Sequence, residues 1–310
     1  RWRFVDNDRK ALRRITLGKT FVESTSSLFA PVTGIQLSNT PTTFRRSFGT
    51  YRLSNKTEPG GTVELYIHNV LVNYMKADAS GFFTFEVPMV YGNSVVTLRF
   101  YGPWGEERVR EQYIRIPFNF IPLHQFEYNF TAGFVGDNEK RLFSRFNFNY
   151  GLSKRITAGG GAEYLSSLFS GKMMPFLNTS VRLGSRLLIS GEHTYGVRTK
   201  GIVNYTFPSD LHIDLNYIKY NKKQTAVPFN YEEERNAVIS IPFQGRKFNA
   251  FSRLSINQIT VLKFKYTTAE FLMSATAAGI SSNFTTHAFF TNSGNPFVYS
   301  NLALTFSLPS

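Results

Sequence analysis

Histidine and carboxylate side chains are the residues of this sequence that could bind a metal or transfer a proton. The five histidines are His68, His124, His193, His212 and His287. None has a second histidine at the spacing of a ligand pair such as H-x-x-x-H or H-E-x-x-H, and zinc sites need several ligands close together. Cysteine is absent, which removes thiolate ligands and disulfides. We therefore predict no metal site and no cofactor.

Four carboxylates, Glu127, Glu163, Glu192 and Asp214, could form an acid–base pair. They lie on separate predicted strands, and no nucleophile elbow or histidine-containing triad accompanies them, so pore lining is the favoured interpretation. The acidic run Glu232-Glu233-Glu234 is interpreted as a solvated loop. No catalytic residue is expected, and the chain is predicted not to be an enzyme.

A glycine-rich stretch, "GGGAEYLSSLFSGKM", contains Gly171-Lys172. A phosphate-binding loop would need glycine where Ser166 stands and serine or threonine where Met173 stands. The stretch is therefore predicted to be a strand followed by a loop, without a nucleotide.

The elements that carry these residues follow a two-residue period after residue 120. In residues 124–135 one face is apolar: Phe126, Tyr128, Phe130, Ala132 and Phe134. The other face holds Gln125, Glu127, Asn129, Thr131 and Gly133. Because successive side chains of a strand point to opposite faces, one face suits hydrocarbon and the other suits water.

The same design recurs to the end of the chain. After 124–135, the predicted strands are 142–150, 156–164, 176–184, 186–195, 199–207, 209–220, 235–243, 247–256, 259–267, 269–277, 283–292 and 297–308. That makes about thirteen strands. The stretches "VGDNEKR", "GLSKR", "LGSR", "FPSD" and "SINQ" are predicted turns, so the strands form consecutive antiparallel hairpins.

Composition decides between a soluble sandwich and a membrane barrel. Aromatic residues make up 16% of the 310 residues, and the mean hydropathy is only -0.20, so aromatic and polar residues are interleaved. No run approaches the roughly 18 to 20 apolar residues of a membrane-spanning helix, whereas a barrel strand needs only about 9 to 11. A sandwich core would use Val, Ile and Leu as much as Phe. A barrel is favoured.

Residues 61–117 differ from the rest of the chain in composition and in the length of the predicted strands. The strands in "GTVELYIHNVLVNYMKA", "GFFTFEVPMV" and "SVVTLRFYGPWGEERVREQYIRIPF" are short, rich in Val, Leu and Ile, and joined by tight turns, near His68-Asn69 and at Gly102-Pro103-Trp104-Gly105. This pattern is typical of a small β-sandwich with its own core. We predict an independently folding domain, entered around Gly60-Gly61 and left between Pro117 and Pro122.

Several stretches, in order, resemble the outer-membrane ushers of the chaperone–usher fimbrial pathway. "RITLGKTFVESTSSLFAPVTGIQL" is similar to usher strands ahead of the plug, "ASGFFTFEVPMVYGNSVVTLRFYGPWGEERVREQYI" to the plug, and "IPLHQFEYNFTAGFVG" to the plug exit. "ERNAVISIPF" and "LALTFSLP" resemble recurring usher strand ends. The chain departs from the family at Ala79-Ser80-Gly81-Phe82, where ushers have Pro-Pro-Gly-Pro, and at Pro103-Trp104-Gly105, where they have an Asp-Gly turn.

The resemblance implies an all-β fold, a transmembrane antiparallel β-barrel with an inserted β-sandwich plug domain. The implied domains are N-terminal barrel strands in 1–60, the plug in 61–117 and further barrel strands in 118–310. Family barrels need more strands and periplasmic domains, so we expect the chain to be a segment of a longer protein.

The implied function is a translocation pore in the bacterial outer membrane of a Gram-negative cell, which secretes fimbrial subunits and assembles them at the surface. Expected partners are protein subunits or chaperone–subunit complexes, outer-membrane lipid, and other outer-membrane or periplasmic proteins. The net charge of +14 is dispersed, so no nucleic acid is expected. The alternatives are a structural subunit of another outer-membrane secretion or assembly complex, and a soluble carbohydrate-binding protein or glycosidase built from β-sandwiches.

Overall fold

The structure, a computed structural model, describes residues 1–28, 30–41, 46–67, 70–78, 81–90, 95–102, 110–115, 118–137, 139–169, 171–228, 230–244, 248–277, 280–292 and 294–306. The regular elements within these ranges are β-strands. In this part of the chain, no helix has the length and apolar character needed to span a membrane. The all-β prediction is therefore confirmed.

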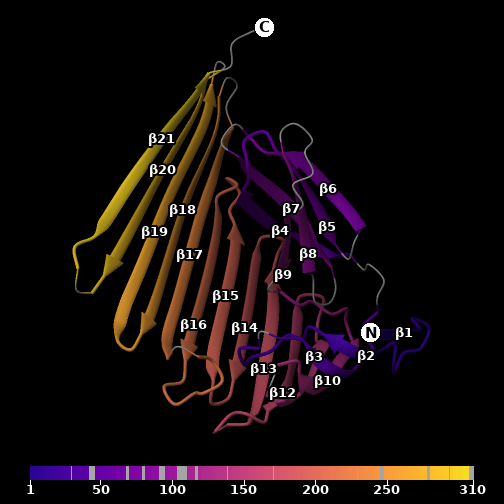
Figure 1. The fold of residues 1–310 in the computed structure, drawn as a ribbon. Coiled ribbons are helices and arrows are strands. Elements are labelled where there is room, and N and C mark those ends of the chain that lie inside the picture. Colours follow the sequence, from indigo (N-terminus) through magenta and orange to yellow (C-terminus); the bar gives the residue numbers. More distant parts are fainter. Residues whose placement is uncertain are drawn as a thin grey trace.

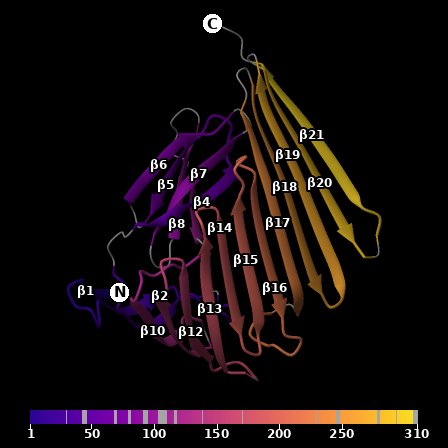
Figure 2. The ribbon, with the colours of Figure 1, turned by 180° about the vertical axis from the view of Figure 1, so that it is seen from behind.

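One antiparallel sheet of fifteen strands dominates the fold, in the order β1-β2-β3-β10 and then consecutively to β21. Its strands are β1 (Trp2–Val5), β2 (Arg14–Thr20), β3 (Val32–Ser38), β10 (Phe126–Val135), β11 (Leu142–Gly151), β12 (Ile156–Leu165), β13 (Met173–Leu183), β14 (Leu187–Thr194), β15 (Arg198–Thr206), β16 (His212–Tyr220), β17 (Tyr231–Gln244), β18 (Phe248–Val261), β19 (Phe264–Ala277), β20 (Ile280–Thr291) and β21 (Phe297–Phe306). Figures 1 and 2 show these strands as one broad sheet with the smaller strands β4 to β8 beside it.

The two faces of this sheet reverse the exposure pattern of a soluble protein. In β10, Glu127 and Thr131 are only 5% and 6% exposed, whereas Phe126 and Phe134 are 49% and 56% exposed. Phe146 of β11, which pairs with Phe130 on the apolar face, is 40% exposed. An apolar face of this extent indicates contact with lipid or with a partner. We call the apolar face outward and the face that carries Glu127 inward.

The remaining strands come between β3 and β10 in the sequence, although β3 and β10 are paired neighbours in the large sheet. They form a two-stranded sheet of β4 (Arg46–Lys56) and β7 (Phe82–Val90), and a four-stranded sheet in the order β6 (Val70–Lys76), β5 (Thr62–Ile67), β8 (Val95–Tyr101) and β9 (Arg110–Arg115). Both small sheets contribute to one hydrophobic cluster. We call residues 46–120 the insert, because they interrupt the β3–β10 hairpin.

The start of this insert corrects the boundary predicted at residue 61. Strand β4, which lies within the predicted N-terminal barrel segment 1–60, pairs with β7 instead of with the large sheet. Its Leu53 is 8% exposed and packs in the cluster that both small sheets share. The alternating pattern of β4 suits either sheet, so the pattern alone could not show which sheet the strand joins. The predicted turns at His68-Asn69 and Pro103-Trp104-Gly105 lie outside the described residues.

The C-terminal strands differ from the prediction in their number and in the position of one turn. Strands β10 to β21 are twelve. The predicted strand 259–267 spans the end of β18, a turn and the start of β19, and the predicted strand 269–277 lies within β19; β18 and β19 have 14 residues each. The predicted turn "SINQ" lies inside β18, and the chain reverses at Leu262 and Lys263, whose φ angles are 49° and 68°. Two-residue hairpins require positive φ, but Leu and Lys give no turn signal. The predicted turns "LGSR" and "FPSD" are confirmed.

The edges of the large sheet are β1 and β21, and within the described residues these strands do not pair with each other. The sheet is therefore open, so these strands do not by themselves close the predicted barrel. Closure depends on how far the strands curl and on what pairs with the two edges. The two-residue period of the sequence specifies neither the curl of the strands nor the partners of the two edges.

The outward face can be tested with one substitution on each side of a strand. Phe146→Arg places a charge on the outward face, and it is expected to cost about 2–4 kcal/mol of folding free energy if the site lies near the bilayer midplane. Asn147→Arg, on the inward face of the same strand, is the matched control and is expected to cost far less. Urea unfolding in lipid vesicles measures both changes, and equal costs would contradict the assignment of the two faces.

Candidate functional site

The inward face of the large sheet is lined with amides, hydroxyls and charges. Strand pairing places Asn216, Asn236 and Asn257 in one row across β16, β17 and β18. A second row contains Asn129 and Asn147 of β10 and β11. Polar rows that continue across several strands need water or polar partners, because a buried amide without a hydrogen bond is costly. The surface is therefore suited to a water-filled lumen.

The four carboxylates considered for acid–base chemistry all lie on this inward face, but each has its own partner. Glu163 contacts Arg145 at 2.5 Å, Glu192 contacts Arg198 at 3.4 Å, and the Asp214 carboxylate lies 3.1 Å from Nε2 of His212. Glu127 also takes part in an interaction within the protein. The structure spreads these groups over β10, β12, β14 and β16 and brings no two of them together.

His212 is the most enclosed of the histidines that the structure describes, at 2% exposure. Its Nδ1 lies 2.9 Å from the Thr206 hydroxyl, and its Nε2 lies 3.0 Å from the Asn204 amide nitrogen. That amide also donates to Asp214 at 2.5 Å. The network joins β15 to β16, and a satisfied buried network of this kind fixes the register of neighbouring strands.

The other described histidines are dispersed. His124 lies beside the Tyr150 hydroxyl at 3.2 Å, His193 beside Thr199 at 2.8 Å, and His287 beside Glu270 at 3.4 Å. His68 lies outside the described residues. Over the part of the chain that the structure describes, no group of three or more His, Cys, Asp or Glu residues could hold a metal ion.

The acidic run is not a solvated loop, as predicted, but the start of β17. Tyr220 donates a hydrogen bond to Glu234 at 2.7 Å, and Arg235 contacts Glu233 at 2.8 Å. Three consecutive carboxylates repel one another in an isolated strand, so these cross-strand and local partners decide the conformation. Gly171, in contrast, has a φ of 66° and belongs to the predicted loop after the glycine-rich strand.

A cluster of polar contacts around Glu163 was not predicted from the sequence. Glu163 is the most buried charged residue on the inward face, at 0% exposure. The loop between β2 and β3 folds against it. Glu163 accepts hydrogen bonds from the Ser24 hydroxyl at 2.9 Å, the Thr25 amide at 2.7 Å, and the Ser26 amide and hydroxyl at 2.9 and 2.5 Å. The hydroxyl-rich run "STSS" was the available signal, but it does not reveal its distant partner.

Apolar contacts hold this loop in the same place. A hydrophobic cluster joins it to the ends of several strands and to the segments around Leu168 and Ala226: Val32, Val135, Phe143, Leu165, Leu168, Met174, Val197 and Ala226, with Val22, Leu28, Ala30 and Val227 packed against them. Arg145, the partner of Glu163, also lies over the Phe176 ring at 4.4 Å. The loop thus covers one end of the inward face over β11 to β13.

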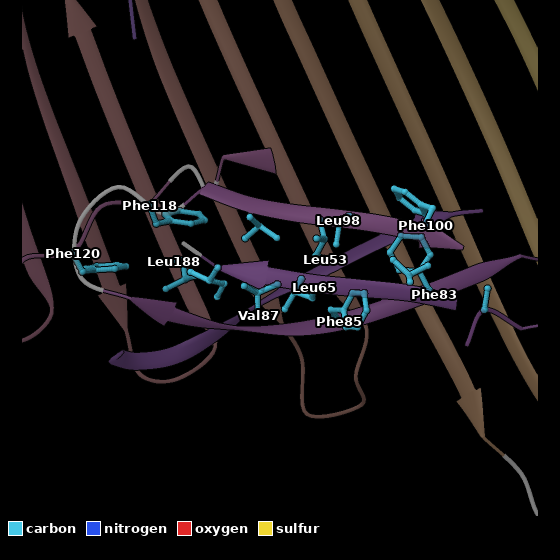
Figure 3. Close-up of a cluster of buried hydrophobic side chains, with 14 residues drawn as sticks. Leu53, Leu65, Phe83, Phe85, Val87, Leu98, Phe100, Phe118, Phe120 and Leu188 are labelled. Carbon is cyan, nitrogen blue, oxygen red and sulfur yellow. The ribbon is translucent and has the colours of Figure 1, made fainter. Parts of the chain in front are cut away.

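The insert packs against the inward face from the other end. Figure 3 shows Leu188 of β14 among the buried side chains of the insert, and Ile202 of β15 packs against the same cluster. The ring of Phe82 in the insert lies 3.9 Å from that of Phe251 in β18. Burial, together with the Asp214 carboxylate of β16, raises the pKa of Tyr51 in the insert. The insert therefore contacts several strands of the large sheet.

The segment that leads out of the insert is fixed to the large sheet. The Asn119 amide donates to the Ser180 hydroxyl at 3.2 Å, and the Ile121 amide donates to the Thr157 hydroxyl at 2.9 Å. Phe118 and Phe120, also labelled in Figure 3, belong to the core of the insert. Leu188 and Ile202 of the large sheet add to a core whose other buried members belong to the insert, so independent folding of the insert stays a prediction.

Neither a protein-family model nor a curated protein sequence matches the chain. Among solved structures, the translocation pore of the P pilus usher PapC has a TM-score of 0.38 and 12% identity, over 94% of this chain and 74% of that chain. Wzi, a carbohydrate-binding β-barrel of the Escherichia coli outer membrane involved in group 1 capsule assembly, has a TM-score of 0.35 and 8% identity, over 94% and 82%. A BenF-like porin from Pseudomonas fluorescens has a TM-score of 0.30 and 12% identity, over 98% and 91%.

The three solved structures are a translocation pore, an outer-membrane barrel and a porin. Every TM-score is below 0.5, so they do not assign the chain to any one of these three kinds of protein. The choice among them depends on the insert and the two faces of the large sheet.

Proposed function

We propose that this chain forms the wall and the movable closure of an outer-membrane translocation pore of the usher type, which passes protein subunits to the cell surface. The observation that carries the proposal is the position of the insert. It interrupts the β3–β10 hairpin and packs on the inward face, where Leu188 completes its core and Phe251 contacts Phe82. A domain in this position can obstruct a lumen lined by that face.

The exposed aromatic and aliphatic side chains of the outward face support a location in the bacterial outer membrane. Strands of about 10 residues with an apolar outer face and a polar inner face are typical of membrane barrels. In hydrocarbon an open sheet edge would leave backbone groups without hydrogen bonds. The proposal therefore requires the edges of β1 and β21 to be paired in the membrane.

The proposed mechanism is displacement of the insert, and it involves no bond making or breaking. Its partners would be protein subunits, alone or bound to a chaperone, that compete with the inward face for the insert. The contacts that hold the insert include polar ones, such as the 3.3 Å hydrogen bond from Ser274 to Asp78. Hydrogen bonds of this kind can be exchanged for hydrogen bonds with cargo, because each contributes only about 1.5–3 kcal/mol even when the acceptor is charged.

A cross-link between the insert and the wall tests this mechanism. The chain has no cysteine, so Asp78→Cys with Ser274→Cys creates the only pair of thiols, at side chains that are in contact. In cells that produce the protein, a short thiol–thiol cross-linker is expected to abolish the appearance of exported subunits at the surface. Surface labelling followed by mass spectrometry measures the export.

Each single-cysteine variant, treated with the same reagent, is the matched control and should export normally. Undiminished export by fully cross-linked protein would contradict the proposal and would favour a structural role for this wall in another assembly. Failure of the untreated double variant to export would show that Asp78 or Ser274 serves transport in another way.

A further inference from the structure

A cavity lies at the root of the insert, where the β1–β2 loop meets the end of β3 and the start of β10. It has a volume of about 580 Å³ and is lined by Asn7, Lys10, Arg13, Asn39, Pro41, His124, Gln125, Phe126 and Glu127. The volume is within the range of small-molecule sites.

The lining of the cavity is suited to an anion. Lys10 and Arg13 bring two positive charges to the cavity, and the His124 ring lines it beside them. Glu127 is only 5% exposed and already interacts within the protein. Guanidinium and ammonium groups bind phosphate through charge-assisted hydrogen bonds. A phosphate group therefore matches the chemistry of the lining.

The backbone around these groups is firmly held. Arg13 donates from Nη1 to the Asn39 carbonyl at 2.9 Å, while the Asn39 side chain accepts from the Tyr128 amide at 2.7 Å and donates to the Phe126 carbonyl at 2.9 Å. The Tyr128 hydroxyl donates to the Ala11 carbonyl at 2.7 Å. These bonds tie the β1–β2 loop to β10, so the cationic side chains extend from a fixed frame.

The strands that adjoin the lining of the cavity carry exposed aromatic rings. On β1, Trp2 and Phe4 are 54% and 39% exposed and stack with 6.3 Å between ring centroids. On β10, Phe126 lines the cavity, is 49% exposed, and lies 5.9 Å from Phe148 of β11. Aromatic rings beside a cationic group are typical of the interface between lipid headgroups and acyl chains.

We infer that this cavity binds the phosphate of an anionic lipid headgroup, while the neighbouring outward rings contact its acyl chains. The cations alone would also suit free phosphate, but the exposed ring of Phe126 in the lining, with the Phe148 ring beside it, favours a lipid. Such a site would hold the β1 edge and the root of the insert at the membrane surface. The inference rests on the membrane location in the proposed function, but not on transport.

Native mass spectrometry of the whole protein in detergent micelles tests this site, with dioleoyl phosphatidic acid as the probe. Lys10→Gln combined with Arg13→Gln is expected to weaken binding by about 25-fold, since each cation near a lipid phosphate contributes a factor of about five. The matched control is Lys222→Gln with Lys223→Gln, which removes the same charge from an exposed loop between β16 and β17.

An equal loss of binding in both double variants would overturn the inference, because it would show attraction by net charge alone. Inorganic phosphate that binds the wild type as tightly as the lipid would also overturn it, in favour of a soluble ligand. Lys10 is exposed, so Lys10→Gln alone, with an expected loss of about fivefold, keeps the test valid if the double variant does not fold. Protein that inserts into membranes but fails this test leaves the proposed pore intact.

Discussion

Removal of the insert is expected to open a wide ion-conducting path through the membrane-inserted protein. Residues 41–123 would be deleted and Thr40 joined to His124 by a short flexible linker. This deletion starts before Arg46 because β4 belongs to the insert, and it removes the exit segment because Phe118 and Phe120 pack in the core of the insert. The hairpin can close, since the Asn39 amide donates to the Tyr128 carbonyl across the junction.

The expectation follows from the polar surface that removal of the insert would uncover. The inward face under the insert carries Asp214, Asn204 and Ser274, which water can solvate once the insert has gone. Conductance in planar bilayers is the measurement, and permeability of the outer membrane to large antibiotics is the cellular check. The control is the protein with the same linker added after Thr40 and the insert retained. Unchanged conductance in a correctly inserted deletion variant would place the insert outside the conducting path.

The loss of the Glu163 carboxylate is expected to be the most destabilising single substitution on the inward face. Glu163→Ala removes five hydrogen bonds, from Ser24, Thr25, Ser26 and Arg145, and leaves the Arg145 guanidinium buried without its counterion. Breaking a buried pair in this way costs about 3–5 kcal/mol. Urea unfolding in vesicles measures the cost, and the loop of residues 21–31 should become sensitive to protease.

Two comparisons separate the possible causes. Glu192→Gln breaks the ion pair with Arg198. The side chains of Glu192 and Arg198 are 24% and 20% exposed, so the substitution should cost at most about 1 kcal/mol of folding free energy. In Glu163→Leu with Arg145→Met, no charge is left unpaired, so unfolding stability should recover in part. The loop should stay sensitive to protease, because the Thr25 and Ser26 amides still lack their acceptor. If Glu163→Ala and Glu192→Gln lowered the free energy of unfolding equally, the role of Glu163 as a buried anchor of the loop would be contradicted.

The division of each strand into two faces was readable from the sequence. The alternation of Phe126, Phe130 and Phe134 with Glu127 and Thr131 predicted opposite faces, and the structure exposes the aromatic face while burying the polar one. Turns with glycine were also readable, as at Gly184 with its φ of 67°. The reversal at Leu262-Lys263 was not, because neither residue has a preference for positive φ that local sequence could reveal.

The sequence by itself determined the class of strand, the two faces, most of the hairpins and the presence of a segment of different texture between β3 and β10. These features depend on side chains that are close along the chain, where a two-residue period and turn residues act locally. The tertiary structure alone decided that β4 joins the insert, that Leu188 completes the insert's core, and that Glu163 anchors the serine-rich loop. Those outcomes depend on contacts between residues that are distant in the sequence: Ser26 and Glu163 are 137 positions apart, and Leu188 lies 68 or more positions from the core residues of the insert. No local pattern specifies such partners, because their free energy arises only when folding removes water from both.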